Sequence, residues 1–281
     1  MARTVVVGVE GTPSSAQALV WAATIAAARK VELSIVCATG DPYASVDIEY
    51  DDAIEQAATS LLKVSTERAL AVAPELVINA VLAHGGAAKA LTDASSQAAL
   101  VVVGSRPLGL MERAFAGSLS YQIAAGSHCP VLVVPEGAAE VGTGVVVGSD
   151  GSAESMGAVA LAAAEADRFG QELTVLHAWH TPLAFMSVDI VTESDDAWVE
   201  ESRRVILAEA VAGLGERYPD LVIHQKLVHD QPARALLDAA RGARMVVVGS
   251  RGRHGIARML LGSVSHTVVL HAPCPVLVAR S

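Results

Sequence analysis

One stretch of the sequence decides the fold: Val246-Val247-Val248-Gly249-Ser250-Arg251-Gly252, followed after nine residues by Gly262-Ser263. The apolar run predicts a buried strand, and the glycines predict a tight turn after it. Gly262-Ser263 predicts the start of a helix, whose first N–H groups have no partner within the helix. A strand that ends in glycine and leads to a helix start is typical of a phosphate-binding loop.

The same stretch predicts how its residues are used. Gly249 and Gly252 allow the backbone to adopt φ > 0 and to approach an anion closely. Ser263 is expected to cap the last helix and to offer its hydroxyl to a phosphate. The alternative is purely structural, with glycines that mark turns and a serine that only caps a helix.

The chain contains this stretch twice. At an offset of 145 residues the first half has Val101-Val102-Val103-Gly104-Ser105-Arg106-Pro107, followed after nine residues by Gly117-Ser118. At an offset of 140, Val6-Val7-Gly8-Val9-Glu10-Gly11-Thr12 matches Val146-Val147-Gly148-Ser149-Asp150-Gly151-Ser152. Such a repeat indicates a tandem duplication, and each half is long enough to bury its own core. We therefore predict two domains, residues 1–138 and 139–281.

Each half alternates short Val/Ile/Leu runs with longer amphipathic segments. Continuous apolar runs indicate strands that are covered on both faces. Strand–helix alternation predicts right-handed crossovers and, in each half, an α/β domain with an open, doubly wound parallel sheet of five strands. The predicted strands are 4–9, 32–37, 76–82, 100–104 and 131–134 in the first half, and 144–148, 172–177, 221–228, 245–249 and 275–279 in the second. The predicted helices of the second half are 153–169, 196–217, 231–242 and 262–271.

A ligand of such a sheet lies beyond the carboxyl ends of the strands, where the strand order reverses. Gly148-Ser149-Asp150, Ala178-Trp179 and the Gly249 loop are expected to converge there in the second half. Asp150 is placed to accept hydrogen bonds from ribose hydroxyls, or to hold a metal ion together with phosphates. Arg251 adds positive charge that suits phosphates. His177 and His180 flank Trp179, but no Cys or carboxylate lies at ligand spacing, so no protein-held metal site is expected.

Composition limits the function classes. A net charge of −10 argues against nonspecific nucleic-acid binding, and no apolar run is long enough to span a membrane. The first residues lack the apolar region of a secretion signal, and three cysteines indicate a reducing interior. We therefore expect a cytoplasmic protein with no membrane or nucleic-acid partner.

Motifs of common nucleotide enzymes are missing from the sequence. It has no Gly-x4-Gly-Lys-Ser/Thr P-loop, no Gly-x-Gly-x-x-Gly after a strand and no Gly-x-Ser-x-Gly. The predicted pocket has parts that hold a nucleotide and no evident base or nucleophile that would transform it.

The pattern Gly249-x2-Gly252-x9-Gly262-Ser263 resembles the nucleotide-binding signature of the universal stress protein family, in its ATP-binding branch. The opening Val147-Gly148-Ser149-Asp150-Gly151-Ser152 and the closing Cys274-Pro275-Val276-Leu277-Val278 are similar to that family's first and last strands. The match in both halves resembles the tandem two-domain members. The resemblance implies a Rossmann-like fold of the adenine nucleotide alpha hydrolase-like type and ATP, with Mg2+, as the ligand.

The resemblance also implies roles for individual residues. Asp150 would meet the ribose, and Ala178 and Val248 would border the adenine. The phosphates would be surrounded by Gly249, Gly252, Gly262, Ser263, Val264 and Ser265. With the adjoining loop residues, the candidate site of the second half is Gly148, Asp150, Ala178, Val248, Gly249, Ser250, Arg251, Gly252, Gly262, Ser263, Val264 and Ser265. The weaker candidate site of the first half is Gly8, Glu10, Ala38, Val103, Gly104, Ser105, Arg106, Gly117, Ser118, Leu119 and Ser120.

The first half departs from the family pattern at two positions. Glu10 replaces the aspartate, and its longer side chain reaches into the space of the ribose. Pro107 replaces the second glycine and has no N–H to donate to a phosphate. Losing one charge-assisted hydrogen bond costs about 1.5–3 kcal/mol, so we expect a weaker site in this half.

Three functional interpretations remain open. The first is an ATP-binding regulator of stress response or growth, which acts through a protein partner. The others are a slow Mg-dependent ATPase or phosphotransferase that uses Asp150, and a nucleotide-free scaffold. A cyclic nucleotide is an alternative ligand. The resemblance further implies that the halves meet along the strands at 131–134 and 276–279. A homodimer of whole chains is left open by the sequence.

Overall fold

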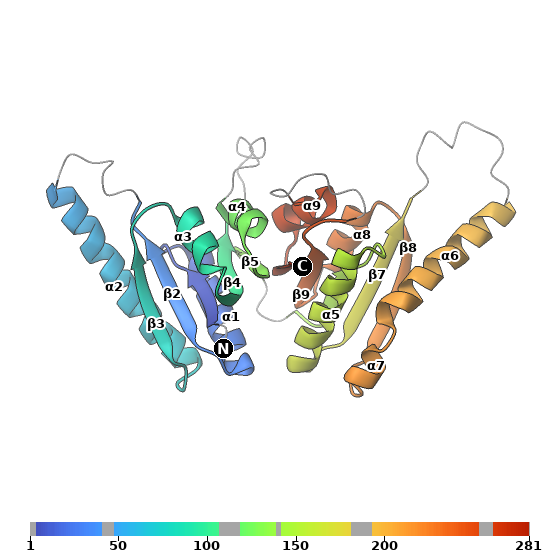
Figure 1. The fold of residues 1–281 in the computed structure, drawn as a ribbon, viewed down its shortest axis with the longest axis horizontal. Coiled ribbons are helices and arrows are strands. Elements are labelled where there is room, and N and C mark those ends of the chain that lie inside the picture. The colour runs from blue at the N-terminus through green and yellow to red at the C-terminus, as the bar shows by residue number, and fades with distance from the viewer. Residues whose placement is uncertain are drawn as a thin grey trace. The chain divides into compact units, whose positions relative to one another are not determined.

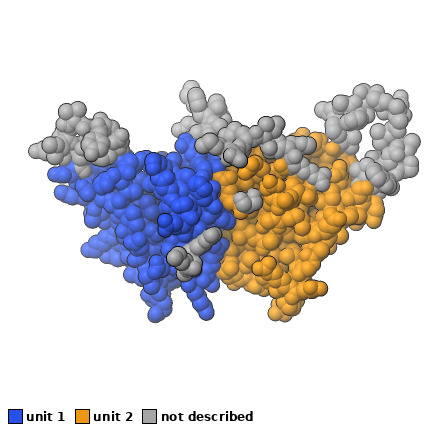
Figure 2. Space-filling view, in the orientation of Figure 1, with its two compact units in different colours: residues 1–138 blue, residues 139–281 orange. Residues whose placement is uncertain are grey.

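The computed structural model describes residues 4–40, 48–106, 119–138, 142–180, 193–252 and 261–280. The chain divides into two compact units, Met1–Ala138 and Ala139–Ser281, which Figure 2 shows in different colours. We call them unit 1 and unit 2. Within the described residues no helix is long and apolar enough to cross a membrane.

Unit 1 is an α/β domain with five parallel strands (Figure 1). Its strand order is β3-β2-β1-β4-β5, so the order reverses beside β1, between β1 and β4. Helices α1 and α2 pack together on the strands, and α3 packs with α4. The elements are β1 (Thr4–Gly8), α1 (Pro13–Arg29), β2 (Leu33–Ala38), α2 (Ile48–Val72), β3 (Ile78–Ala83), α3 (Ala87–Ala94), β4 (Ala98–Ser105), α4 (Leu119–Gly126) and β5 (Val131–Pro135).

Unit 2 repeats this architecture. Its strands are parallel in the order β10-β9-β6-β7-β8, with the reversal between β6 and β9. Helices α5 and α6 contact one another, and α8 contacts α9. The elements are β6 (Val145–Gly148), α5 (Ala153–Arg168), β7 (Leu173–Trp179), α6 (Glu193–Val211), α7 (Leu214–Arg217), β8 (Ile223–His229), α8 (Pro232–Ala239), β9 (Met245–Gly249), α9 (Ser263–His271) and β10 (Val276–Ala279).

The two faces of each sheet are covered by different helices. A Cβ placed on Gly148, at the end of β6, would point at Leu236 of α8, whereas one on Gly249, at the end of β9, would point at Glu154 of α5. The central strands are therefore buried on both sides, and Val246 and Val247 are fully inaccessible to solvent. This burial explains why the central strands are continuous apolar runs. The predicted fold class, two tandem doubly wound domains, is confirmed.

One predicted helix is divided in the structure. The helix expected at 196–217 consists of α6 and the short α7, which begins after Gly213. Gly213 has φ 74°, a left-handed conformation that cannot continue a right-handed helix. The glycine therefore ends the regular backbone bonding of α6.

Candidate functional site

Unit 2 has a cavity of about 410 Å³ where the loops after β6, β7 and β9 come together. It includes the reversal between β6 and β9, the position at which doubly wound sheets bind ligands. Eleven of the twelve candidate residues of this half line it: Gly148, Asp150, Ala178, Val248, Gly249, Arg251, Gly252, Gly262, Ser263, Val264 and Ser265.

Ser250, the remaining candidate, does not line the cavity and is only 2% exposed. Its N–H donates to the carbonyl of Ala279 at 3.0 Å, and its carbonyl accepts from the N–H of Gly262 at 2.9 Å. Ser250 therefore joins the loop after β9 to β10 and to the start of α9. Its backbone shapes the loop, although its side chain is not among the surfaces that a ligand would meet.

Asp150 is held by the loop in which it lies. Its Oδ1 accepts hydrogen bonds from the N–H of Ser152 at 2.9 Å and from the Ser152 hydroxyl at 2.6 Å. Gly151 between them has φ 79°, so the glycine that needs the left-handed region is in this loop. Ser152 also caps α5 by accepting from the N–H of Ser155. The carboxylate is therefore fixed against the start of α5.

Neither Gly249 nor Gly252 uses the positive φ that glycine makes possible. The described glycines with left-handed φ do not include either of them. At Gly252 the reason for glycine is space, because a Cβ there would lie 2.6 Å from Oδ2 of Asp150. At Gly249 a Cβ would lie 3.0 Å from the carbonyl oxygen of Arg251. At Gly252 the loop therefore lies so close to the first loop of the unit that an added side chain must displace the Asp150 carboxylate.

The predicted capping role of Ser263 is wrong. Gly262 is the N-cap residue of α9, with no side-chain cap, and Ser263 is the first residue of the helix. The expectation failed because glycine itself tolerates the extended N-cap conformation, here φ −61° and ψ 157°. Ser265 instead joins α9 to the end of β9, because its buried hydroxyl donates to the carbonyl of Gly249 at 2.6 Å.

Unit 1 has a smaller cavity, of about 280 Å³, at the equivalent position. Nine candidate residues line it: Gly8, Glu10, Ala38, Val103, Gly104, Ser105, Arg106, Leu119 and Ser120. The hydroxyl of Ser120 donates to the carbonyl of Gly104 at 2.9 Å, which matches the Ser265 bond of unit 2. Gly117, Ser118 and Pro107 lie outside the described residues.

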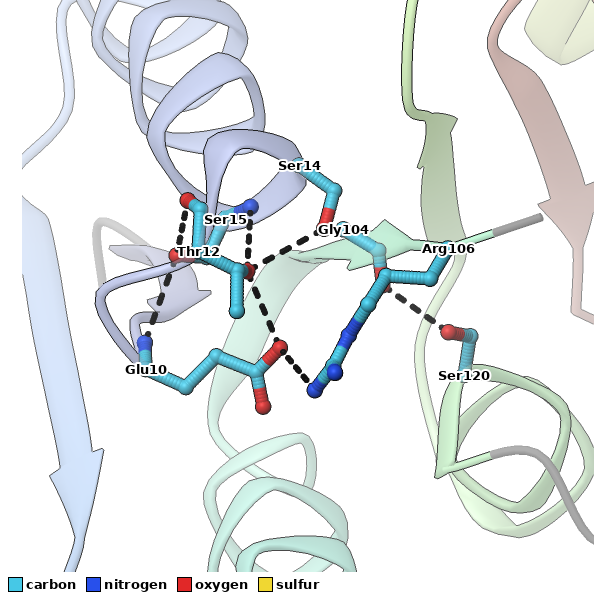
Figure 3. Close-up of polar contacts among 7 residues, drawn as sticks. All are labelled: Glu10, Thr12, Ser14, Ser15, Gly104, Arg106 and Ser120. Atoms are coloured by element: carbon cyan, nitrogen blue, oxygen red, sulfur yellow. Dashed lines mark hydrogen bonds and ion pairs between the residues drawn. The ribbon is translucent and has the colours of Figure 1, made fainter.

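Glu10 has a different environment from Asp150 (Figure 3). Its Oε1 accepts from the hydroxyl of Thr12 at 3.0 Å and forms an ion pair with Nη2 of Arg106 at 3.1 Å. Arg106 is the counterpart of Arg251 in the repeat. Both charges of this pair are substantially exposed, so the pair contributes at most about 1 kcal/mol to stability. It nevertheless places the longer carboxylate beside the cation that would meet phosphates.

Comparison with protein-family models identifies the family of the chain. The model of the universal stress protein family matches it twice, over residues 1–135 and 144–280. The chain belongs to the universal stress protein family. The resemblance predicted from the two copies of the motif is thereby confirmed, and each compact unit contains one copy of the family's domain.

Universal stress proteins of similar length align with the whole chain. One from Mycobacterium tuberculosis is 36% identical over 289 residues, which cover 98% of this chain and 96% of the relative. Another from the same species is 37% identical over 308 residues, covering 98% of this chain and 94% of the relative. The crystal structure of a universal stress protein from Archaeoglobus fulgidus covers 100% of this chain and 99% of its own, with a TM-score of 0.72 and 20% identity. This last similarity supports the fold.

The cavity of this universal stress protein also has lining residues outside the set of candidate site residues. Trp179, which the sequence already placed at this end of the sheet, lines the cavity together with His177, Arg203 and Leu236. His177 is buried, and its Nδ1 lies 2.7 Å from the carbonyl oxygen of Ser149, so Nδ1 carries the proton of this hydrogen bond. Strand alternation could have placed His177 and Trp179 on one face, but no sequence signal placed Arg203 beside them.

His84 and His229 occupy equivalent positions in the repeat, and neither lines the cavity of its unit. His229 instead stacks on Trp179, with ring centroids 4.2 Å apart and planes at 18°. Among the described residues no group of three or more His, Cys, Asp or Glu side chains could hold a metal ion.

Proposed function

We propose that this universal stress protein binds ATP in the cavity of unit 2 and acts as a nucleotide-occupied regulator of stress response or growth in the cytoplasm. One observation carries the proposal: a phosphate-type loop, a helix start, a fixed carboxylate and an apolar wall all line one cavity at the reversal of strand order. Its volume lies within the range of small-molecule sites.

The phosphates have a suitable binding surface on the β9 side of the cavity. The start of α9, from Ser263 onward, brings N–H groups that have no partner within the helix, and the positive end of the helix dipole, to the cavity. Arg251 lines the same region and forms no ion pair with another described residue that would neutralise it. In a chain of net charge −10, this local positive charge favours an anionic ligand.

The nucleoside has a suitable binding surface next to the phosphate surface. Asp150 supplies a carboxylate oxygen, Oδ2, which is separate from the oxygen bonded to Ser152 and can accept from ribose hydroxyls. Ala178, Val248 and Leu236 form an apolar wall against which a base can pack. Polar groups at one end of an apolar pocket are typical of nucleotide sites.

A regulatory role is favoured over catalysis by the side chains that line the cavity. Among the described residues that line the cavity, Asp150 is the only one with a carboxylate, and His177 is engaged with the carbonyl of Ser149. Asp150 could supply one carboxylate to a Mg2+ ion that is bound mainly by the phosphate oxygens of the nucleotide, as is common in nucleotide sites. Such an ion would neutralise phosphate charge, and the chain's own residues would position the nucleotide.

The proposal is tested by mass spectrometry of ligand released from the purified protein, with calorimetric titration of ATP and of cyclic AMP. We expect bound ATP without turnover, and about tenfold weaker binding for Asp150→Asn. Asp220→Asn, at an exposed position, is the matched control and should bind like the parent. Absence of nucleotide binding would contradict the proposal, and multiple turnovers abolished by Asp150→Asn would establish the enzymatic alternative.

A further inference from the structure

The cavity of unit 2 extends to both faces of the sheet. Gly148 pairs in register with Leu176, and a Cβ on Gly148 would point at Leu236 of α8. Because side chains alternate along a strand, Leu176 and Ala178 face α8, whereas His177 and Trp179 face the side of α5 and α6. All of these residues line the cavity, as does Arg203 of α6. We call His177, Trp179 and Arg203 the α6-side lobe.

The described residues of unit 1 form no counterpart of this lobe. From β2 its cavity is lined by Val36 and Ala38, and the counterparts of His177 and Trp179, which are Cys37 and Thr39, do not line it. The counterpart of Arg203 in α2 is found by matching the buried residues of α2 with those of the equivalent region of unit 2. Leu62 and Ala69 of α2 are buried like Leu207 and Leu214 of unit 2, at the offset of 145 residues. The same offset pairs Arg203 with the buried Ala58.

The α6-side lobe combines an aromatic ring with a hydrogen-bond donor. Trp179 is held in place because its ring stacks on His229. Arg203 has a buried Nε that finds no hydrogen-bond acceptor among the described residues. Guanidinium nitrogens are donors only, so a ligand group that satisfies them must present acceptors.

A nucleobase has the properties that match this lobe. It is planar, its faces stack on aromatic rings, and its edges carry nitrogen acceptors. Ala178 and Val248 line the cavity from the α8 side, and Trp179 and Arg203 line it from the α6 side, so a base that lies across the strand ends can meet both sets. The phosphate loop is formed by different residues, so the lobe can affect the nucleoside without affecting the phosphates.

We propose that Trp179 and Arg203 are specificity-determining residues that recognise the nucleoside part of the ligand in unit 2. This inference rests on the proposed function, nucleotide binding in that cavity. With these residues, the cavity of unit 2 would bind a nucleotide more tightly than a polyphosphate that lacks a nucleoside. The cavity of unit 1, with Thr39 and Ala58 at the equivalent positions, would bind the nucleoside part more weakly.

The test replaces each residue by its counterpart from unit 1, as Trp179→Thr and Arg203→Ala. Arg204→Ala is the matched control, because Arg204 is the next residue of α6 and pairs with Glu200 at the surface. Trp179→Phe tests whether an aromatic ring suffices. Calorimetry with ATP, adenosine and inorganic tripolyphosphate separates recognition of the nucleoside from recognition of the phosphates.

We expect Trp179→Thr and Arg203→Ala to bind ATP and adenosine roughly 5- to 150-fold more weakly, the range typical for loss of a base-stacking side chain. Their affinity for tripolyphosphate should remain that of the parent, which also shows that the variants are folded. Trp179→Phe and Arg204→Ala should retain most of the affinity for all three probes.

The contrary outcomes can be told apart. If the parent binds ATP but both unit-1-like variants bind it equally well, this inference is overturned and the proposed function stands. If the variants lose tripolyphosphate binding in parallel with ATP, the two residues act through the fold and the inference is also overturned. If the parent binds no nucleotide, the proposed function fails and this inference fails with it.

Discussion

Gly252 shows that a glycine can be required although its backbone is ordinary. Its φ lies outside the left-handed region, so alanine could adopt the same backbone. The missing Cβ instead leaves space for the carboxylate of Asp150, whose Oδ2 would be 2.6 Å from it. Two loops that are about one hundred residues apart in the sequence therefore share one small volume beside the candidate site.

Gly252→Ala should therefore impair binding more than stability. The new methyl group must displace the carboxylate, which is the end of a flexible side chain, and we expect roughly tenfold weaker ATP binding with a change in unfolding free energy below about 0.5 kcal/mol. Calorimetric titration and urea denaturation measure the two quantities.

The matched control for this substitution is Gly157→Ala in α5. A Cβ there meets open space, so ATP binding should be unchanged and the helix should gain about 0.5–1 kcal/mol. Parental affinity in Gly252→Ala would show that the position of the Asp150 carboxylate does not matter to the ligand.

At the scale of elements, a serine in each unit fixes a helix to the end of a strand. Ser265 of α9 donates to the carbonyl of Gly249, and Ser120 of α4 donates to the carbonyl of Gly104. Both serines are buried, so each hydroxyl also satisfies a carbonyl at the end of its strand, away from solvent. The bond sets how closely the helix start approaches the loop of the candidate site.

Ser265→Ala should destabilise unit 2 by about 1–3 kcal/mol, the cost of leaving a buried acceptor without its partner. Thr267→Ala, in the same helix, removes an exposed hydroxyl that bonds to the carbonyl of Ser263 and should cost less than about 0.5 kcal/mol. Urea denaturation compares the two. Equal effects of the two substitutions would mean that the Ser265 bond does not stabilise the loop.

Sequence patterns predicted the elements better than the contacts between them. The buried strands and the loop positions followed from apolar runs and glycines, because both are local signals. The break at Gly213 was missed since an isolated glycine is often tolerated within a helix. Arg203 was missed because its position depends on how α6 packs across β7, a contact between distant segments that no local pattern records.

At the scale of the whole molecule, the two candidate sites are unequal. Unit 2 has the larger cavity, whereas in unit 1 Glu10 pairs with Arg106 and Pro107 cannot donate an N–H. We expect titration to resolve two classes of ATP site that differ by about 1–3 kcal/mol, with unit 2 the tighter.

Glu10→Asp combined with Pro107→Gly should strengthen the weaker class, as measured by calorimetry beside the parent protein. The substitutions restore the residues that unit 2 has at these positions. Two equal sites in the parent would refute the asymmetry. A tighter site in unit 1 would mean that the proline places its loop better than glycine does.

All three cysteines of the chain should resist alkylation until the protein unfolds. Cys37, Cys129 and Cys274 are buried. Burial raises the pKa of the Cys274 thiol from 9.0 to about 12, and burial also raises the pKa of Cys37. The unfolded state therefore loses these protons first, so stability should fall as pH rises from about 9 towards 12.

Iodoacetamide labelling at pH 8, followed by mass spectrometry, checks the first part of this prediction. We expect no adduct on the native protein and three on the protein in denaturant. Rapid labelling of Cys274 in the native protein would contradict it. Urea denaturation at pH 8 and pH 10 checks the second part, with the lower stability expected at pH 10.

The glycine at the end of the first strand of each unit sets the depth of the cavity beside it. A Cβ would lie 3.0 Å from a methyl carbon of Leu236 at Gly148, and 2.7 Å from one of Leu91 at Gly8. Leu236 of α8 and Leu91 of α3 can therefore pack directly against the backbone of these strands. A graded series of larger residues at either glycine would lift the adjacent leucine by small steps. Ligand size could then be tuned in one unit while the loops that contact the ligand stay unaltered.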